Sequence, residues 1–159
     1  MTTQHTLISP LGLSPGAVSG VAFALRRITA NDEDSAPYPI SRVVTVGTYN
    51  PEVMEASRCL AALFRAAGIE YRPEFITQTE LKESDNSVPD FVTRLGEMFD
   101  RYRDDTLHVA VTAGRSGMGA LAALAASLYG ADYLWHLWVS ESIEEKGHIR
   151  RLQQPFTPD

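Results

Sequence analysis

Strand-like and helix-like segments alternate from one end of this 159-residue sequence to the other. Short apolar and β-branched runs predict strands at residues 5–11, 42–48, 71–77, 107–113 and 133–140. The segments between them carry apolar residues at a helical period, as at Val18, Val21, Ala22, Leu25 and Ile28. Such alternation produces a parallel sheet, because parallel neighbours need a long crossover connection. We therefore expect an α/β fold with a doubly wound, mostly parallel sheet of about five or six strands and helices on both faces.

Two glycine-rich turns follow the first and the fourth predicted strands, "GLSPG" at 12–16 and "GRSGMG" at 114–119. Pro73 indicates that 71–77 is an edge strand, which suits the strand order 3-2-1-4-5. In that order the winding reverses between the first and fourth strands, and ligands bind at the carboxyl ends of the strands that flank the reversal. Turns of this kind present backbone N–H groups to phosphate. The sequence therefore predicts a pocket for a phosphate-bearing ligand between the two turns.

Charge and cysteine content indicate which ligands and which cellular compartment to expect. A formal net charge of −6 disfavours binding to long nucleic acid, where neutralised phosphates supply most of the affinity. Cys59 is the single cysteine, so we expect no internal disulfide and a reducing, cytoplasmic location. The sequence shows no basic leader segment and no apolar run of about 18 residues, so we expect no membrane span.

The histidines lack partners at a spacing typical of metal ligands, so we expect no bound metal. His136 lies between Trp135 and Trp138 in the last predicted strand. We expect it to be a packed, hydrogen-bonded side chain of an inner strand.

The stretch "TAGRSGMGALAALAA" at 112–126 also fits the short-chain dehydrogenase pattern Thr-Gly-x-x-x-Gly-x-Gly, except that Ala113 replaces the first glycine. In those enzymes the turn follows the first strand, whereas here it follows the fourth predicted strand. The chain has no Tyr-x-x-x-Lys pair to relay protons. A nicotinamide-dinucleotide-binding enzyme stays open as an alternative that a cofactor titration would decide.

Taken together, the two turns resemble those of CRISPR-associated Rossmann-fold (CARF) proteins, and above all the small stand-alone members that act as ring nucleases. "GLSP" at 12–15 matches their Gly-x-Ser-Pro turn, and "AGRSGMG" at 113–119 is similar to their turn Gly-Gly-Arg-Lys-x-Met-Gly. "SLYG" at 127–130 and a final strand with His and "VS" add to the likeness, which spans about residues 5–141. The resemblance implies a CARF-like Rossmann domain over 1–141 and a polar C-terminal tail or small lid over 142–159.

The resemblance also implies a homodimer that binds cyclic oligoadenylate, with cyclic tetra-adenylate the expected ring, and that needs neither cofactor nor metal. A ribose 2′-OH would attack the adjacent phosphate, leave a 2′,3′-cyclic phosphate and switch off type III CRISPR signalling. Arg115 and Ser14 are the expected catalytic residues, since a planar guanidinium suits phosphate oxygens and a hydroxyl can hydrogen-bond the phosphate or orient the 2′-OH. The expected ligand-binding residues are Gly12, Leu13, Thr48, Gln78, Gly114, Ser116, Gly117 and Met118.

The second turn departs from the family pattern at two positions. Ser116 stands where relatives often carry a second basic residue, and Ala113 replaces a common glycine. A missing cation weakens ring binding, transition-state stabilisation or both, so a non-cleaving sensor that acts through a partner protein stays open. Ser14 and Pro15 also fit a plain helix start, with an N-cap followed by proline in the first turn.

Overall fold

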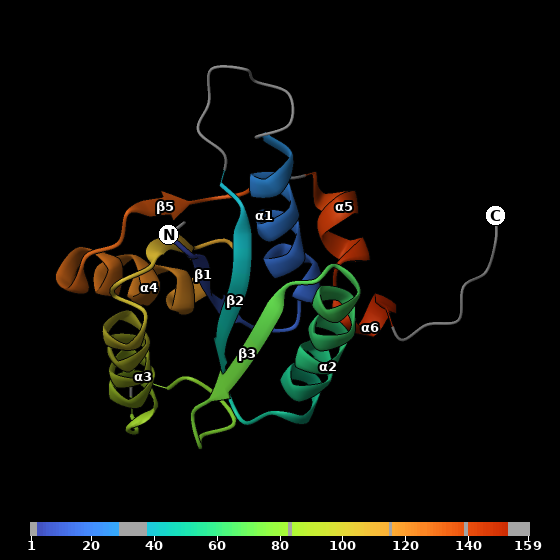
Figure 1. Cartoon of the computed structure of the whole chain (residues 1–159). Coiled ribbons are helices and arrows are strands. Elements are labelled where there is room, and N and C mark those ends of the chain that lie inside the picture. Colours follow the sequence, from blue (N-terminus) through green and yellow to red (C-terminus); the bar gives the residue numbers. More distant parts are fainter. Residues whose placement is uncertain (1–2, 29–37, 83, 115, 139, 153–159) are drawn as a thin grey trace.

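The computed structural model describes residues 3–28, 38–82, 84–114, 116–138 and 140–152. These residues form a five-stranded sheet in the order β3-β2-β1-β4-β5, in which every neighbouring pair is parallel (Figure 1). The strands are β1 (His5–Leu11), β2 (Ile40–Gly47), β3 (Glu70–Phe75), β4 (Thr106–Ala110) and β5 (Tyr133–Trp135). The predicted doubly wound α/β fold is confirmed, with its reversal between β1 and β4.

Helices cover both faces of the sheet. In the described residues they are α1 (Pro15–Ile28), α2 (Pro51–Ala66), α3 (Ser87–Arg101), α4 (Ser116–Tyr129), α5 (Glu141–Lys146) and α6 (Ile149–Leu152). α1 and α2 pack on one face, and α3 and α4 pack on the other (Figure 1). Successive strand residues point to opposite faces, so Leu7 of β1 joins the α1–α2 core and Ile8 joins the α3–α4 core. Among these helices none is both long and apolar enough to cross a membrane.

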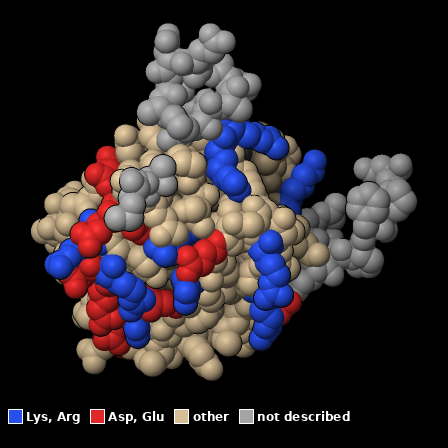
Figure 2. Space-filling model, viewed as in Figure 1, with Lys and Arg blue, Asp and Glu red and all other residues tan. Residues whose placement is uncertain are grey.

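β3 lies at one edge of the sheet, as Pro73 predicted. Ion pairs border this edge. Glu70 contacts Arg42 at 2.8 Å and Arg72 at 2.6 Å, and Glu74 contacts Arg101 of α3 at 3.3 Å. On the face of the molecule that Figure 2 shows, acidic and basic side chains are interspersed and do not form one broad basic surface. Charged side chains at an edge strand disfavour pairing with another sheet.

The last two strands are shorter than the sequence predicts. β4 ends at Ala110 and β5 ends at Trp135, whereas the predicted runs reach residues 113 and 140. The Val111 N–H still donates to the Trp135 carbonyl at 3.0 Å, but the Leu137 N–H donates instead to the Thr112 hydroxyl at 2.7 Å. The chain therefore leaves the sheet after β5 and runs beside the β4–α4 turn. His136 is exposed as a result, so the expected packed position of this histidine is wrong.

The residues after β5 return to the first half of the chain. α5 packs on α1 and α6 packs on α2, and we call residues 141–152 the C-terminal strap. Its Ile149 is fully buried in the α1–α2 core, and the Ile149 N–H donates to the Leu13 carbonyl at 2.7 Å. Most of the strap belongs to the segment that we expected to be a tail or lid. The lid role stays a prediction, and residues 153–159 lie outside the described part of the chain.

Candidate functional site

A pocket of about 560 Å³ lies at the carboxyl ends of β1, β4 and β5. Three parts of the chain line it: the β1–α1 turn, the β4–α4 turn, and the chain after β5, from which residues within 136–138 and 143–148 contribute. The predicted site residues Leu13, Ser14 and Gly114 are among its lining. The pocket therefore lies between the two glycine-rich turns, at the reversal of the sheet where ligands of such folds bind.

Gly114 shapes the β4–α4 turn. Its φ of +87° lies in the left-handed region, which favours glycine. A Cβ at this position would lie 2.7 Å from the Met118 sulfur and 3.1 Å from the Pro10 Cβ. Glycine thus lets the turn after β4 approach β1 closely, and this approach brings the two turns to one pocket.

The β1–α1 turn is held in place by its own helix and by the strap. The Ala17 N–H donates to the Ser14 carbonyl at 3.1 Å, in the first turn of α1. The Gly16 N–H donates to the Gly147 carbonyl at 3.1 Å, so the backbone of the strap touches the start of the helix. Ser14 is half-buried and lines the pocket.

The other predicted site residues fall into two groups. Gly12, Thr48 and Met118 line a second, smaller cavity of about 60 Å³, which Leu13 also borders. Gln78 lines neither cavity. Its side-chain N–H donates to Asp90 at 2.7 Å, and its backbone carbonyl accepts the Tyr49 N–H at 2.8 Å. The structure thus gathers Ser14 and Gly114 in the main pocket and separates Gln78 from it.

The start of α4 carries the remaining candidates. Arg115 lies outside the described residues, and α4 begins at Ser116. Gly117 follows in the first turn of the helix, is exposed, and has open space where a Cβ would lie. Arg115 is therefore bracketed in the chain by Gly114, in the pocket lining, and by the first residue of α4.

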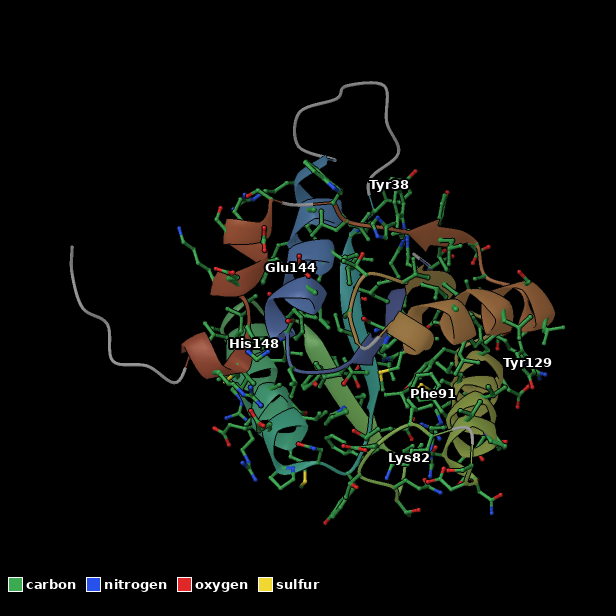
Figure 3. All side chains as sticks on the ribbon, turned by 180° about the vertical axis from the view of Figure 1, so that it is seen from behind. Tyr38, Lys82, Phe91, Tyr129, Glu144 and His148 are labelled. Atoms are coloured by element: carbon green, nitrogen blue, oxygen red, sulfur yellow. The ribbon has the colours of Figure 1, made fainter. Side chains whose placement is uncertain are left out.

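Sequence reasoning missed the pocket residues that follow β5, chiefly Trp138, Glu144, Lys146 and His148. Figure 3 shows Glu144 on α5 and His148 where α5 gives way to α6. The Nδ1 atom of His148 accepts the Arg150 N–H at 3.2 Å, which leaves Nε2 as the ring nitrogen for a ligand. Within the described residues Lys146 forms no ion pair. The segment is mostly polar and holds the apolar residues Ile143, Ile149 and Leu152, of which only Ile149 is buried.

His5 and His108 form a separate cluster near the amino ends of β1 and β4. The Trp135 indole N–H donates to His108 Nδ1 at 2.9 Å, and His108 Nε2 lies 3.0 Å from His5 Nδ1. Burial, followed by the nearby His5, lowers the pKa of His108 to about 4. No group of three or more His, Cys, Asp or Glu in the described part of the chain is arranged to hold a metal ion.

Two solved structures have a similar fold. Enterococcus italicus Csm6 bound to cyclic hexa-2′-fluoro-hexa-dAMP matches with a TM-score of 0.61 and 15% identity, over 97% of this chain and 41% of that chain. A type III CRISPR defence DNA nuclease activated by cyclic oligoadenylate matches with a TM-score of 0.58 and 17% identity, over 86% of this chain and 19% of that one. This chain thus spans less than half the length of either protein.

No curated protein matches the sequence. A family model does: residues 27–158 match the model of CRISPR-associated protein NE0113 (Cas_NE0113). This match includes the β4–α4 turn, the chain after β5 and the strap, and so most of the pocket wall. The chain therefore belongs to the CRISPR-associated NE0113 family.

Proposed function

We propose that this protein is a ring nuclease that binds cyclic oligoadenylate, cyclic tetra-adenylate in particular, and opens the ring without a metal ion. The observation that carries the proposal is the pocket between the β1–α1 and β4–α4 turns at the reversal of the sheet. Membership of a CRISPR-associated family supports it, as does the fold shared with Csm6 and with a nuclease activated by cyclic oligoadenylate. Ring opening would end the signal that such proteins detect.

The proposed reaction uses the ring's own nucleophile. A ribose 2′-oxygen bonds to the adjacent phosphorus, and the bond from phosphorus to the 5′-oxygen breaks. The 2′-hydroxyl proton passes to solvent, and the 5′-oxygen takes a proton from water. The products carry a 2′,3′-cyclic phosphate and a 5′-hydroxyl. The protein's task is to hold the 2′-oxygen in line and to stabilise the charge that gathers on the phosphate.

Ser14 and Arg115 are the residues we assign to this task. Ser14 lines the pocket and would hydrogen-bond the phosphate or orient the 2′-OH. Arg115 follows Gly114 of the lining, and its guanidinium would pair with phosphate oxygens. Backbone N–H groups at the start of α4 would add to the cradle, because they lack partners within the helix.

A second copy of the chain is part of the proposal. α4 and the edge strand β5 carry large apolar side chains that are exposed in the described residues, including Leu124, Leu128 and Leu134. An apolar surface of this kind is typical of an interface between proteins. We propose that it pairs with the same surface of a second copy, which would bring two pockets to one ring.

A non-cleaving sensor is the second candidate. Ser116 supports it, because a basic residue there would add positive charge to stabilise the transition state. A sensor would bind the same ring in the same pocket and would leave it intact. A nicotinamide enzyme is the third alternative, and a titration with oxidised and reduced dinucleotide would exclude it.

The experiment that tests the proposal follows the fate of the ring. Purified protein is incubated with cyclic tetra-adenylate and, separately, cyclic hexa-adenylate in excess EDTA, and products are identified by liquid chromatography with mass detection. We expect linear di-adenylate with a 2′,3′-cyclic phosphate from the tetra-adenylate ring. An intact ring that co-elutes with the protein would instead establish the sensor, and a ring that neither binds nor breaks would contradict both.

Variants of the assigned residues locate the reaction. Arg115→Ala should lower the rate of ring opening about a hundredfold, and Ser14→Ala about tenfold or more. Arg103→Ala is the matched control, since Arg103 is exposed and pairs only with Asp100, at 3.5 Å, among the described ion pairs. Equal turnover by Arg115→Ala and the unaltered protein would show that the site is assigned wrongly.

A further inference from the structure

Three positions of the C-terminal strap make specific contacts: Gly147 and Ile149 contact the β1–α1 segment, and Arg150 contacts α2. The Gly147 carbonyl accepts the Gly16 N–H, and the Ile149 N–H donates to the Leu13 carbonyl. Ile149 is fully buried, and Arg150 donates two hydrogen bonds to the carboxylate of Glu52 on α2, at 2.9 and 3.0 Å. These contacts fix the position of the strap, which forms one wall of the pocket.

One charged side chain on that wall, Lys146, lacks an ion-pair partner among the described residues. Lys146 and Glu144 are the two side chains of full charge in the described lining of the pocket. Lys146 is exposed and has no ion pair with any acid in the described residues. The residues of the β1–α1 turn that line the pocket, Leu13, Ser14, Gly16 and Ala17, are all uncharged. A cation thus borders a cavity to which this turn contributes hydrogen-bonding groups and no anion.

We propose that Lys146 is a phosphate-binding residue of this pocket, and that it supplies the second positive charge that the β4–α4 turn lacks at Ser116. This inference rests on the proposed function, since it takes the ligand to be a phosphodiester ring. Lysine is a compact cation on a long flexible stem, and it binds phosphate as a point charge. The next residue, Gly147, contacts Gly16 in the first turn of α1, so the strap holds the Lys146 backbone beside the β1–α1 turn that carries Ser14, and a phosphate bound there would contact both.

Glu144 gives the proposal a test of opposite sign. Its carboxylate lies in the same lining, where it repels a phosphate and attracts Lys146. Removal of this carboxylate should therefore strengthen ring binding, whereas removal of the Lys146 ammonium should weaken it. If the strap served only in packing, the two substitutions would not change ring binding in opposite directions, because both side chains are exposed.

The experiment measures the dissociation constant of a 2′-deoxy form of cyclic tetra-adenylate, which lacks the attacking 2′-hydroxyl and stays intact, by isothermal titration calorimetry at several salt concentrations. Lys146→Ala should raise the dissociation constant about tenfold and make its salt dependence shallower, because one contact between an ammonium and a phosphate is lost. Lys146→Arg should keep most of the affinity, and Glu144→Gln should lower the dissociation constant. Lys82→Ala is the matched control, since Lys82 is the other lysine of the chain and lines neither pocket.

Two results would overturn the inference, and they are distinguishable. If the unaltered protein binds the ring and Lys146→Ala binds it equally well with the same salt dependence, Lys146 does not contact phosphate and the proposed function stands. If the unaltered protein binds no ring, the proposed function fails and this inference fails with it. Thermal unfolding of each variant shows whether the fold is retained, and Glu144→Gln tests the charge effect with Lys146 in place.

Discussion

The backbone of Gly16, in the first turn of α1, touches the backbone of Gly147, just after α5. The Gly16 N–H donates to the Gly147 carbonyl at 3.1 Å, and a Cβ on Gly16 would lie 2.6 Å from the Gly147 Cα. Real Cβ atoms essentially never approach a neighbour this closely. The strap can therefore reach the β1–α1 turn only because neither residue carries a side chain, and one wall of the pocket depends on this contact.

Gly16→Ala should loosen the strap while the sheet stays folded. Overpacking of this kind costs about 1–3 kcal/mol, and here the strap can lift away to relieve it. Limited trypsin digestion, with cleavage after Lys146 followed by mass spectrometry, should be about tenfold faster in the variant. Gly117→Ala is the control, since a Cβ there meets no described atom within 4 Å. Equal cleavage rates for Gly16→Ala and the unaltered protein would show that the contact does not hold the strap.

Trp138 should stack on an adenine of the bound ring. It lines the pocket and is 82% exposed, so its indole face is free for a base. Stacking of a base on an aromatic side chain contributes about 1–3 kcal/mol, so Trp138→Ala should weaken ring binding about tenfold or more, and Trp138→Phe should weaken it less. Ring binding should quench tryptophan fluorescence in the unaltered protein but not in Trp138→Phe, where Trp135 remains. Persistent quenching in that variant would place the base elsewhere.

Leu128→Glu should separate the proposed dimer into monomers. Leu128 is 68% exposed on α4, so the change disturbs no described core, but a glutamate would put an unpaired charge into an apolar interface. Light scattering coupled to size-exclusion chromatography gives the mass of each species. Leu63→Glu, at an exposed position on α2, is the matched control and should stay dimeric. A monomeric mass for the unaltered protein at all concentrations would contradict the dimer.

His108 should make the protein less stable in mild acid. Its pKa is lowered to about 4 in the folded chain, by burial first and then by His5, against about 6.5 when unfolded. Between these values the unfolded chain binds a proton that the folded chain does not bind. The free energy of unfolding should therefore fall as the pH drops from about 6.5 to 4, by up to about 3 kcal/mol.

Nuclear magnetic resonance checks this prediction directly. The imidazole of His108 should stay neutral, with its proton on Nε2, because Nδ1 accepts the Trp135 indole N–H. Chemical denaturation at each pH gives the free energy of unfolding. In His108→Phe the free energy of unfolding should change less steeply with pH between pH 4 and 6.5. A His108 signal that titrates near pH 6.5 would contradict the assigned environment.

The sheet could be predicted from the sequence because its signals are local. β1 was predicted at its observed bounds, and Pro73 identified the edge strand. Apolar and β-branched runs predict buried strands wherever helices cover both faces of the sheet. β4 and β5 end earlier than predicted. The Thr112 hydroxyl accepts the Leu137 N–H in place of a strand pairing, and these two residues are 25 positions apart in the sequence. Such a pairing leaves no periodic pattern in the sequence.

Only part of the pocket could be predicted, because local turns leave a signal in the sequence and long-range contacts do not. Glycine-rich turns are readable, and Ser14 and Gly114 indeed line the pocket. The opposite wall comes from a polar segment whose single strong apolar anchor is Ile149, and whose position depends on Gly16 and Gly147 meeting across more than a hundred residues. Lys146 and Trp138 could not be assigned to the pocket until that long-range contact was known.

Hydrogen–deuterium exchange with and without the 2′-deoxy form of cyclic tetra-adenylate, which cannot be opened by 2′-attack, tests most directly whether the ring binds between the two turns and under the strap. Ring binding should slow exchange in three segments: residues 12–17, residues 112–119 and the strap at 141–149. Edge strand β3, on the far side of the sheet, should exchange at an unchanged rate. Protection confined to other segments, or no protection at ring concentrations that saturate binding, would contradict binding in this pocket.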